Sequence, residues 1–140
     1  CTEFIPAYNE LFKFLHTKGG KKEVIKFWES LSDSFLGNLH DLVAEKGLNG
    51  CFEYWSHTLS EEAADFTMTL DEEASVFQIQ MHHCPSMGKL IESEHIEPYP
   101  FYCHHCDTLY RRVLVPLGLE YDIDLSQCHK ATCTLTVKRK

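Results

Sequence analysis

The feature of this sequence that most constrains its fold is a change in the spacing of apolar residues near position 64. Before that position, large apolar side chains recur every three or four residues, as along one face of an α-helix. After it, Phe66, Met68 and Leu70 alternate with polar residues, which is the pattern of a β-strand with one buried face. Helical spacing followed by strand spacing predicts an α+β fold, with helices packed on an antiparallel sheet.

The first 62 residues are expected to form helices only. Apolar residues with helical spacing predict three of them, over residues 4–15, 24–42 and 52–59. Gly19-Gly20 ends the first helix and Gly47 ends the second, because glycine is a common helix stop. Their apolar stripes are interpreted as core.

Residues 63–140 are expected to contain two β-hairpins separated by two helices. Phe77, Ile79 and Met81 belong to the second strand, and Pro85 ends that strand because proline has no N–H for the ladder. The two helices are expected over residues 86–94 and 101–115, and the last hairpin pairs residues 119–125 with 131–137. The chain is thus predicted to be one domain, 1–140, with a helical part (1–62) and a hairpin–helix–helix–hairpin part (63–140) around about four strands.

The alternation also predicts how the last two strands pair. Ile123 is expected opposite Cys133 and Tyr121 opposite Leu135, with residues 126–130 as the turn, because facing partners share one side of a sheet. With this register Cys133 faces the core, and the acidic residues of the first strand of this hairpin face the solvent.

Charge and composition exclude several classes of protein. The net charge is −8, and this excess of carboxylates repels a phosphate backbone, so nucleic-acid binding is not expected. No apolar run approaches the ~18 residues of a transmembrane helix, so no membrane span is expected. The seven cysteines are odd in number and too sparse for a disulfide scaffold, which favours a reducing compartment and a cytoplasmic protein. Trimming of the chain explains Cys1 better than a lipoprotein terminus does.

Three short segments rich in cysteine and histidine carry the strongest chemical signal. They are His82-His83-Cys84, Cys103-His104-His105-Cys106-Asp107, and Cys128-His129 with Cys133. Thiolate and imidazole are the ligands that zinc prefers, usually four in a tetrahedron, and residues i and i+3 of a helix share a face. The sequence therefore predicts a zinc site drawn from Cys84, Cys103, Cys106, Cys128 and Cys133. The alternative is that Cys51, Cys106 and Cys133 are buried as small apolar side chains.

The helix that contains the Cys103–Cys106 pair has a predicted orientation. Cys106 is expected to be more buried than Cys103, and His104 is expected to be exposed beside Arg111 on the polar side. His83 lies on the apolar face of its strand, where a hydrogen-bonded core histidine is a stronger expectation than a metal ligand.

Cys84 is also a candidate nucleophile. A thiol becomes reactive where a helix N-terminus or a neighbouring cation lowers its pKa. Cys84 precedes Pro85 and a predicted helix, so it is expected near a helix N-terminus, with His83 beside it in sequence. Asp107 is a candidate for orienting a histidine or holding a substrate amine; the alternative is a solvated helix residue.

Four short motifs within residues 66–137 resemble the L-2-amino-thiazoline-4-carboxylic acid hydrolase-like family. They are Cys84-Pro85 after a strand, Cys106-Asp107 in the next long helix, Leu117-Gly118-Leu119 at its exit, and Cys133-Thr134-Leu135. Members usually carry a Gly-Asp pair and an aromatic residue in the last hairpin, where this chain has His129-Lys130 and Leu135. The resemblance implies ring-opening hydrolysis of a small cyclic amidine that carries a carboxylate, with Cys84 as the active group.

The arrangement also resembles, more distantly, the 4-vinyl reductase-type small-molecule-binding domains. Those domains hold a zinc ion with cysteines from the helix and the last hairpin, which implies Cys106, Cys128 and Cys133 as ligands. Two functions are therefore expected as alternatives: a cysteine-dependent hydrolase acting on a C–N bond, or a non-catalytic small-molecule-binding domain with a zinc site. Either function requires a small-molecule partner, and a homodimer is also expected.

Overall fold

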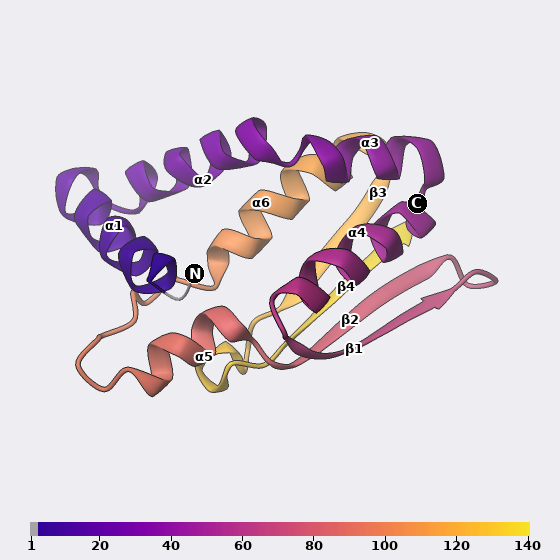
Figure 1. Ribbon diagram of the computed structural model, residues 1–140. Helices are drawn as coiled ribbons and strands as arrows, with labels where there is room; N and C mark the ends of the chain where they lie inside the picture. The colour runs from indigo at the N-terminus through magenta and orange to yellow at the C-terminus, as the bar shows by residue number, and fades with distance from the viewer. Residues whose placement is uncertain (1–2) are drawn as a thin grey trace.

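The structure, a computed structural model, describes residues 3–140 as six α-helices and one four-stranded antiparallel sheet (Figure 1). The helices are α1 (Phe4–Gly19), α2 (Lys21–Phe35), α3 (Gly37–Lys46), α4 (Leu48–Glu61), α5 (Pro85–Glu92) and α6 (His104–Leu114). The strands are β1 (Asp65–Asp71), β2 (Val76–His83), β3 (Leu119–Asp124) and β4 (Cys133–Arg139), with two 3₁₀ turns, η1 (Val115–Leu117) and η2 (Cys128–Lys130). Helices α4 and α6 pack on one face of the sheet, which confirms the predicted α+β class.

One helix expected from the sequence is two helices in the structure. The predicted helix over residues 24–42 is divided into α2 and α3 at Leu36, where φ is −94° and ψ is 21°. The side chain of Leu36 is buried, and Gly37, a poor helix former, follows it. The break lets α2 pack along α1 and α6 while α3 packs on α4. The prediction of one long helix is wrong because apolar spacing continues across a change of direction.

The sheet has the strand order β1-β2-β4-β3, so β2 and β4 lie at its centre. Strand β4 begins at Cys133, and it pairs with β3 so that Ile123 faces Leu135 and Tyr121 faces Val137. The predicted pairings of Ile123 with Cys133 and of Tyr121 with Leu135 are therefore wrong by two residues.

The register differs because the connection between β3 and β4 is longer than expected. The turn η2 and the left-handed residue Ala131, with φ of 61°, precede the strand. A shift of two residues keeps every side chain on its predicted face of the sheet. Asp122 and Asp124 are accordingly exposed, and Cys133 is half-buried opposite Met81 of β2.

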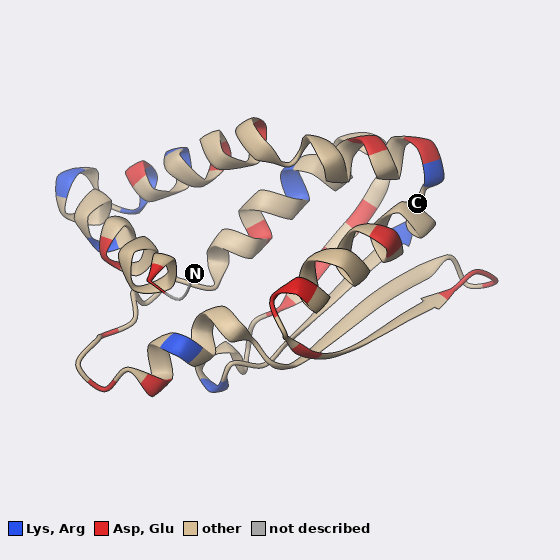
Figure 2. Cartoon of the chain, in the orientation of Figure 1, with Lys and Arg blue, Asp and Glu red and all other residues tan. Residues whose placement is uncertain are grey.

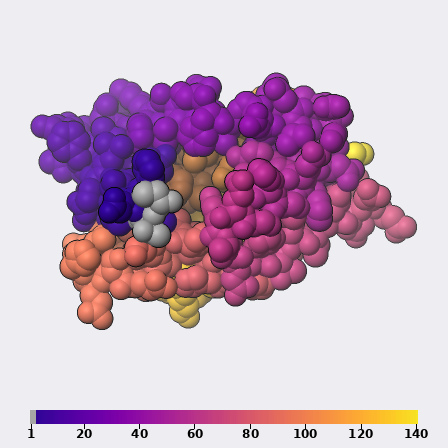
Figure 3. Space-filling model, viewed as in Figure 1, coloured from indigo at the N-terminus to yellow at the C-terminus, as the bar shows by residue number. Residues whose placement is uncertain are grey.

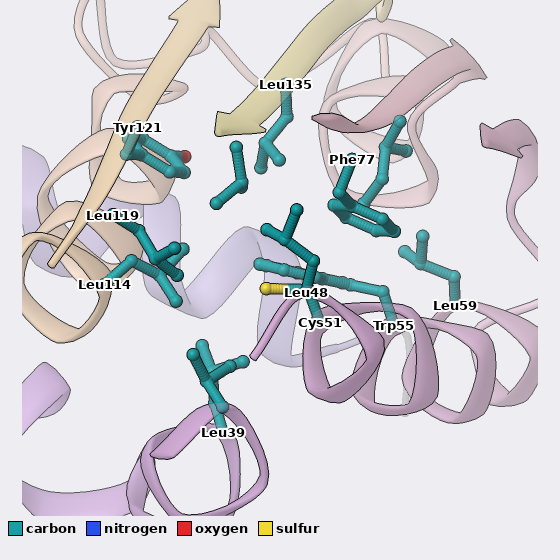
Figure 4. Packing of buried hydrophobic residues seen from close by; sticks show 13 residues of the cluster. Leu39, Leu48, Cys51, Trp55, Leu59, Phe77, Leu114, Leu119, Tyr121 and Leu135 are labelled. Carbon is teal, nitrogen blue, oxygen red and sulfur yellow. The ribbon is translucent and has the colours of Figure 1, made fainter. Parts of the chain in front are cut away.

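A first hydrophobic core lies between the sheet and helices α3, α4 and α6 (Figure 4). Trp55 of α4 stacks on Phe77 of β2, with ring centroids 5.7 Å apart and an interplanar angle of 17°. Leu135 of β4 is also buried in this core, and Cys51 of α4 is fully buried there, as expected of a small apolar side chain. Each large apolar side chain contributes roughly 1.5–3 kcal/mol when buried, so this core holds the helices on the sheet.

A second core joins α1, α2 and α5 to the loop that leads into α6. Phe12 of α1 contacts Trp28 of α2 edge to face, with ring centroids 5.3 Å apart, and it contacts Tyr102 at 5.4 Å. All three side chains are almost completely buried. Because Tyr102 directly precedes Cys103, this core fixes the segment that carries the CxxC pair.

Charged residues are distributed along the helices and at several positions on the strands and their connections (Figure 2). Arg112 of α6 links two helices, because its guanidinium lies 2.9 Å from Glu29 and 2.9 Å from Asp33 of α2. Within residues 3–140, no helix is both long and apolar enough to cross a membrane.

Asn9 of α1 supports a first test of this packing. Its side chain is fully buried, donates to the carbonyl oxygen of Glu97 at 2.9 Å, and accepts from the N–H of Tyr99 at 2.7 Å. We expect Asn9→Ala to lower the free energy of unfolding by about 2–3 kcal/mol, because it leaves a buried N–H without a partner and removes packed atoms. Urea denaturation measures the change, and the exposed Asn38→Ala is the control. Equal effects of the two substitutions would contradict this role of Asn9.

Candidate functional site

Five cysteines from distant parts of the chain line one small cavity of about 40 Å³, which we call the thiol chamber. They are Cys84 before α5, Cys103 and Cys106 at the start of α6, Cys128 in η2, and Cys133 at the start of β4. The N–H of Cys84 donates to the carbonyl oxygen of Ala131 at 2.8 Å, which ties the start of α5 to the end of η2. The three cysteine-bearing segments thus meet at one place in the fold.

Cys84 is the N-cap residue of α5, with φ of −70° and ψ of 122°, and Pro85 follows it at the first helical position. The sequence prediction that Cys84 lies at a helix N-terminus is therefore confirmed. Burial raises the pKa of its thiol to about 11, and nearby Cys106 acts in the same direction. The backbone N–H groups of Ser86 and Met87 act in the opposite direction, since they stabilise a thiolate. Cys84 is therefore a protonated thiol at neutral pH that needs a base to ionise.

Burial also keeps the thiols of Cys103, Cys106 and Cys133 protonated. Burial raises the pKa of Cys106 and that of Cys133 to about 12, and neighbouring Cys106 raises the pKa of Cys133 further. Burial raises the pKa of Cys103 even more strongly, followed by the effect of Cys128. Neighbouring thiols add to the raised pKa of Cys84, Cys103 and Cys133, because a second thiolate in the same cavity would repel the first.

His105 supplies a base within the thiol chamber. Its Nδ1 is hydrogen-bonded to the carbonyl oxygen of Tyr102. A carbonyl oxygen can only accept, so Nδ1 carries the proton and Nε2 has the lone pair that accepts a hydrogen bond. This Nε2 lies 3.6 Å from the sulfur of Cys106. Burial lowers the pKa of His105, which keeps the ring neutral and able to accept a proton.

A much larger cavity, of about 790 Å³, opens beside the thiol chamber; we call it the open cavity. It lies between α1, the end of α4, α5 and the start of α6, and Figure 3 shows the hollow between these helices. Its charged lining residues are one lysine and three glutamates: Lys89, Glu61, Glu62 and Glu92. Burial raises the pKa of Glu62, and neighbouring Glu61 adds to this. The cavity thus offers both signs of charge to a small polar molecule.

Three residues line both cavities and form the wall between them: Ser86, Tyr102 and His105. The hydroxyl groups of Ser86 and Tyr102 are hydrogen-bonded at 2.6 Å. These three side chains therefore lie between a molecule in the open cavity and the thiols of the chamber.

Two further sequence-predicted site residues lie away from the thiol chamber. Asp107 forms a surface ion pair with Arg111, with a separation of 2.8 Å, and it lines neither of these cavities. His83 lies 3.7 Å from Glu92 on the rim of the open cavity, and its side chain is 52% exposed. The expectation of a core histidine at position 83 is wrong, because its ring lies beside Gly88 of α5 at the edge of this cavity instead of under a helix.

The orientation predicted for the start of α6 is wrong for one residue. His104 is half-buried rather than exposed, and its ring lies 5.4 Å from that of Phe101. Burial and nearby Lys21 lower the pKa of His104. The N-terminal helices cover this turn, which the polar pattern of α6 by itself does not reveal.

Sequence reasoning missed Ser86, Lys89, Tyr102 and the particular role of His105. Tyr102 and His105 are three residues apart, as are Cys103 and Cys106, so helical spacing places each pair on a shared face. That spacing was the available signal for His105. Nothing in the sequence indicated that Lys89 of α5 and the end of α4 enclose one cavity.

In the part of the chain that the structure describes, no three or more His, Cys, Asp or Glu side chains are arranged to hold a metal ion. The five thiols therefore do not form a ready-made ligand set in this arrangement, and the zinc site stays a prediction. Cys1 lies outside the described residues. No family model, no curated protein and no solved structure matches this chain.

His105 predicts a dependence of stability on pH. Burial lowers its pKa from the ordinary value of 6.5, so the unfolded chain binds this proton more readily than the folded protein. Stability should therefore fall as the pH drops below 6.5, by at most about 1.4 kcal/mol per pH unit for this group. We expect His105→Gln to remove the contribution of this residue to the pH dependence of stability, measured by urea unfolding at pH values above and below 6.5. The exposed His57→Gln should retain it, and equal pH profiles of wild type and His105→Gln would contradict the burial of a neutral ring.

Proposed function

We propose that the protein is a cysteine-dependent hydrolase that opens the ring of a small cyclic amidine carrying a carboxylate. The observation that carries this proposal is the position of His105: a neutral imidazole whose Nε2 accepts from a thiol, that of Cys106, in the wall between an open cavity and a chamber of thiols. A thiol, a base and a group that orients the base are the requirements of nucleophilic catalysis by cysteine. The resemblance to the L-2-amino-thiazoline-4-carboxylic acid hydrolase-like family supplies the substrate class.

The charges of the open cavity suit such a substrate. A cyclic amidine with a carboxylate carries a positive and a negative group a few bonds apart. Lys89 is the cation available to the carboxylate, and Glu62 is an acceptor for the amidinium. A cationic group beside Glu62 offsets the repulsion from Glu61 that raises the pKa of this side chain.

Cys84 is the nucleophile in this proposal. Its sulfur forms a bond to the amidine carbon while its proton passes to Nε2 of His105, the imidazole that lines the same chamber. The ring C–N bond then breaks, and the proton on His105 goes to the leaving nitrogen. Water attacks the remaining thioimidate, which releases the opened product and restores the Cys84 thiol. The N–H groups of Ser86 and Met87 stabilise the charge that develops on sulfur.

Turnover of 2-amino-thiazoline-4-carboxylate by the purified protein tests the proposal. Proton NMR follows the ring protons, and we expect them to be replaced by those of an open-chain product at a rate proportional to protein concentration. The assay is repeated after dialysis against a chelator, because the proposed steps use only residues of the chain. Absence of ring opening at high protein concentration would contradict the proposed reaction.

The second candidate is a non-catalytic ligand-binding domain with a zinc site, and the convergence of five thiols favours it. In that case the thiols rotate to ligate one ion, and metal-binding free energy adds to folding free energy. Metal analysis of protein purified without chelator distinguishes the two candidates. Bound zinc whose removal lowers the thermal stability of the protein supports the second candidate.

The homodimer stays a prediction, which a measurement of molar mass in solution tests. The cytoplasmic location also stays a prediction.

A further inference from the structure

The open cavity is far larger than a small heterocyclic ring with its carboxylate. Its volume of about 790 Å³ falls within the ~300–1,000 Å³ that is typical of sites for drug-sized ligands. The proposed function assigns Lys89 and Glu62 to the two charged groups of the substrate, which leaves the side of the cavity formed by α1 without a role. A ligand that uses the whole cavity therefore extends beyond the reacting ring.

Helix α1 contributes an apolar wall to this cavity, which consists of Phe4, Ile5 and Tyr8. Tyr8 follows Phe4 by four residues and Ile5 by three, so the three side chains lie on one side of the helix. The ring of Tyr8 lies 6.1 Å from that of His105, which places Tyr8 at the inner end of the wall, next to the thiol chamber. Phe4 lies one turn, about 5.4 Å, further along α1 and is 72% exposed. The wall thus runs from the thiol chamber toward solvent and offers two aromatic rings to a ligand.

The last turn of α4 gives the cavity a negative end. Glu61 ends this helix and Glu62 caps it, both line the cavity, and the last turn contains no basic residue. The carbonyl oxygens at a helix C-terminus carry a partial negative charge, which adds to the charge of the two carboxylates. Glu92 of α5 adds a third carboxylate to the lining, against one ammonium group from Lys89. A cation is therefore favoured over an anion or a neutral group at the end of α4.

We propose that the open cavity binds an amidinium that bears an aromatic group, with the amidinium at Glu61 and Glu62 and the aromatic group against Phe4 and Tyr8. The inference rests on the proposed function for the amidinium, and it adds the substituent that the substrate carries. An aromatic ring in the cavity packs edge to face or offset on the rings of the wall. It also removes the exposed surface of Phe4 from water, which favours binding.

Titration of the purified full chain with benzamidine tests the site, because benzamidine joins an amidinium directly to an aromatic ring. Saturation-transfer NMR detects binding and measures the dissociation constant. Acetamidine has the cation but no ring, and benzamide has the ring but no charge, so these two compounds are the reference ligands. We expect each of them to bind at least about tenfold more weakly than benzamidine, because each lacks one of the two contacts.

Two pairs of substitutions locate the ligand in this cavity. Phe4→Ala removes an exposed ring that lines the cavity, and Phe14→Ala removes an exposed ring of the same helix that does not line it. Glu62→Gln removes a charge from the cavity, and Glu73→Gln removes one from the exposed turn between β1 and β2. We expect Phe4→Ala and Glu62→Gln each to raise the dissociation constant of benzamidine about two- to tenfold, and the two controls to leave it unchanged.

Absence of saturation transfer to benzamidine at millimolar concentration would overturn the inference. Equal effects of Phe4→Ala and Phe14→Ala would do the same, and so would equal affinities for acetamidine and benzamidine. These measurements do not depend on turnover. Ring opening of 2-amino-thiazoline-4-carboxylate by a protein that does not bind benzamidine would leave the proposed hydrolase in place and remove its aromatic substrate. Benzamidine binding without ring opening would do the reverse.

Discussion

Leu135→Asp should prevent folding. Leu135 lies in the central strand β4, its side chain is 6% exposed, and it faces Ile79 of β2 and Ile123 of β3. An aspartate at this position places a carboxylate among apolar side chains with no cation to pair with it. Burial of an unpaired charge costs about 4–5 kcal/mol or more, which is comparable with the whole stability of a domain of this size. Circular dichroism during thermal unfolding should show no cooperative transition.

Gln80→Asp is the matched control for this prediction. Gln80 lies in the other central strand, β2, but its side chain is exposed on the outer face of the sheet. An exposed carboxylate keeps its water, so the free energy of unfolding should change by no more than about 1 kcal/mol. A cooperative transition in Leu135→Asp at the same temperature as in Gln80→Asp would show that the inner face of β4 is assigned incorrectly.

Cys84→Ser should abolish hydrolysis and leave the fold intact. A serine hydroxyl loses its proton far less readily than a thiol, so His105 cannot generate an equivalent nucleophile. We expect kcat/KM for the cyclic amidine to fall on the order of 10³-fold or more, as when other enzymes lose a covalent nucleophile. Cys84 is half-buried and serine is nearly the same size, so the thermal transition should move by only a few degrees.

Cys51→Ala is the control for the loss of a thiol. Cys51 lies in the first core rather than in the thiol chamber, so this variant should hydrolyse the substrate like the wild type. Full activity of Cys84→Ser together with loss of activity in Cys106→Ser would reassign the nucleophile to the thiol that contacts His105.

The pattern of apolar and polar residues was sufficient to predict the fold class, but it did not predict the irregular segments that connect the helices and strands. Alternation in β3 and β4 assigned each side chain to the correct face, because the period of a strand is two and the register error was also two. The error arose in the connection, where no simple pattern marks the 3₁₀ turn η2 or the left-handed Ala131. The break at Leu36 was missed for a similar reason, since apolar spacing predicts a helix but not its direction.

The cysteines of the site were predictable, and the surroundings of those cysteines were not. Residue type and position singled out Cys84 and the CxxC pair, and the structure brings them to one chamber. The sequence does not distinguish His104 from His105; a hydrogen bond to the carbonyl oxygen of Tyr102 does. Asp107 was expected near a reacting group, but Arg111 lies one helical turn away and pairs with it at the surface.

The most direct test of the central claim is to trap the covalent intermediate. Wild-type protein is mixed with excess 2-amino-thiazoline-4-carboxylate, quenched with acid during turnover, digested with trypsin and analysed by mass spectrometry. Cys84 and Cys51 share the tryptic peptide 47–89, so the experiment is run in parallel on Cys51→Ala. Nucleophilic catalysis by Cys84 predicts an adduct with the mass of the ring-opened substrate on this peptide in both proteins, and none in Cys84→Ser. Turnover without an adduct, at a rate that Cys84→Ser retains, would contradict it.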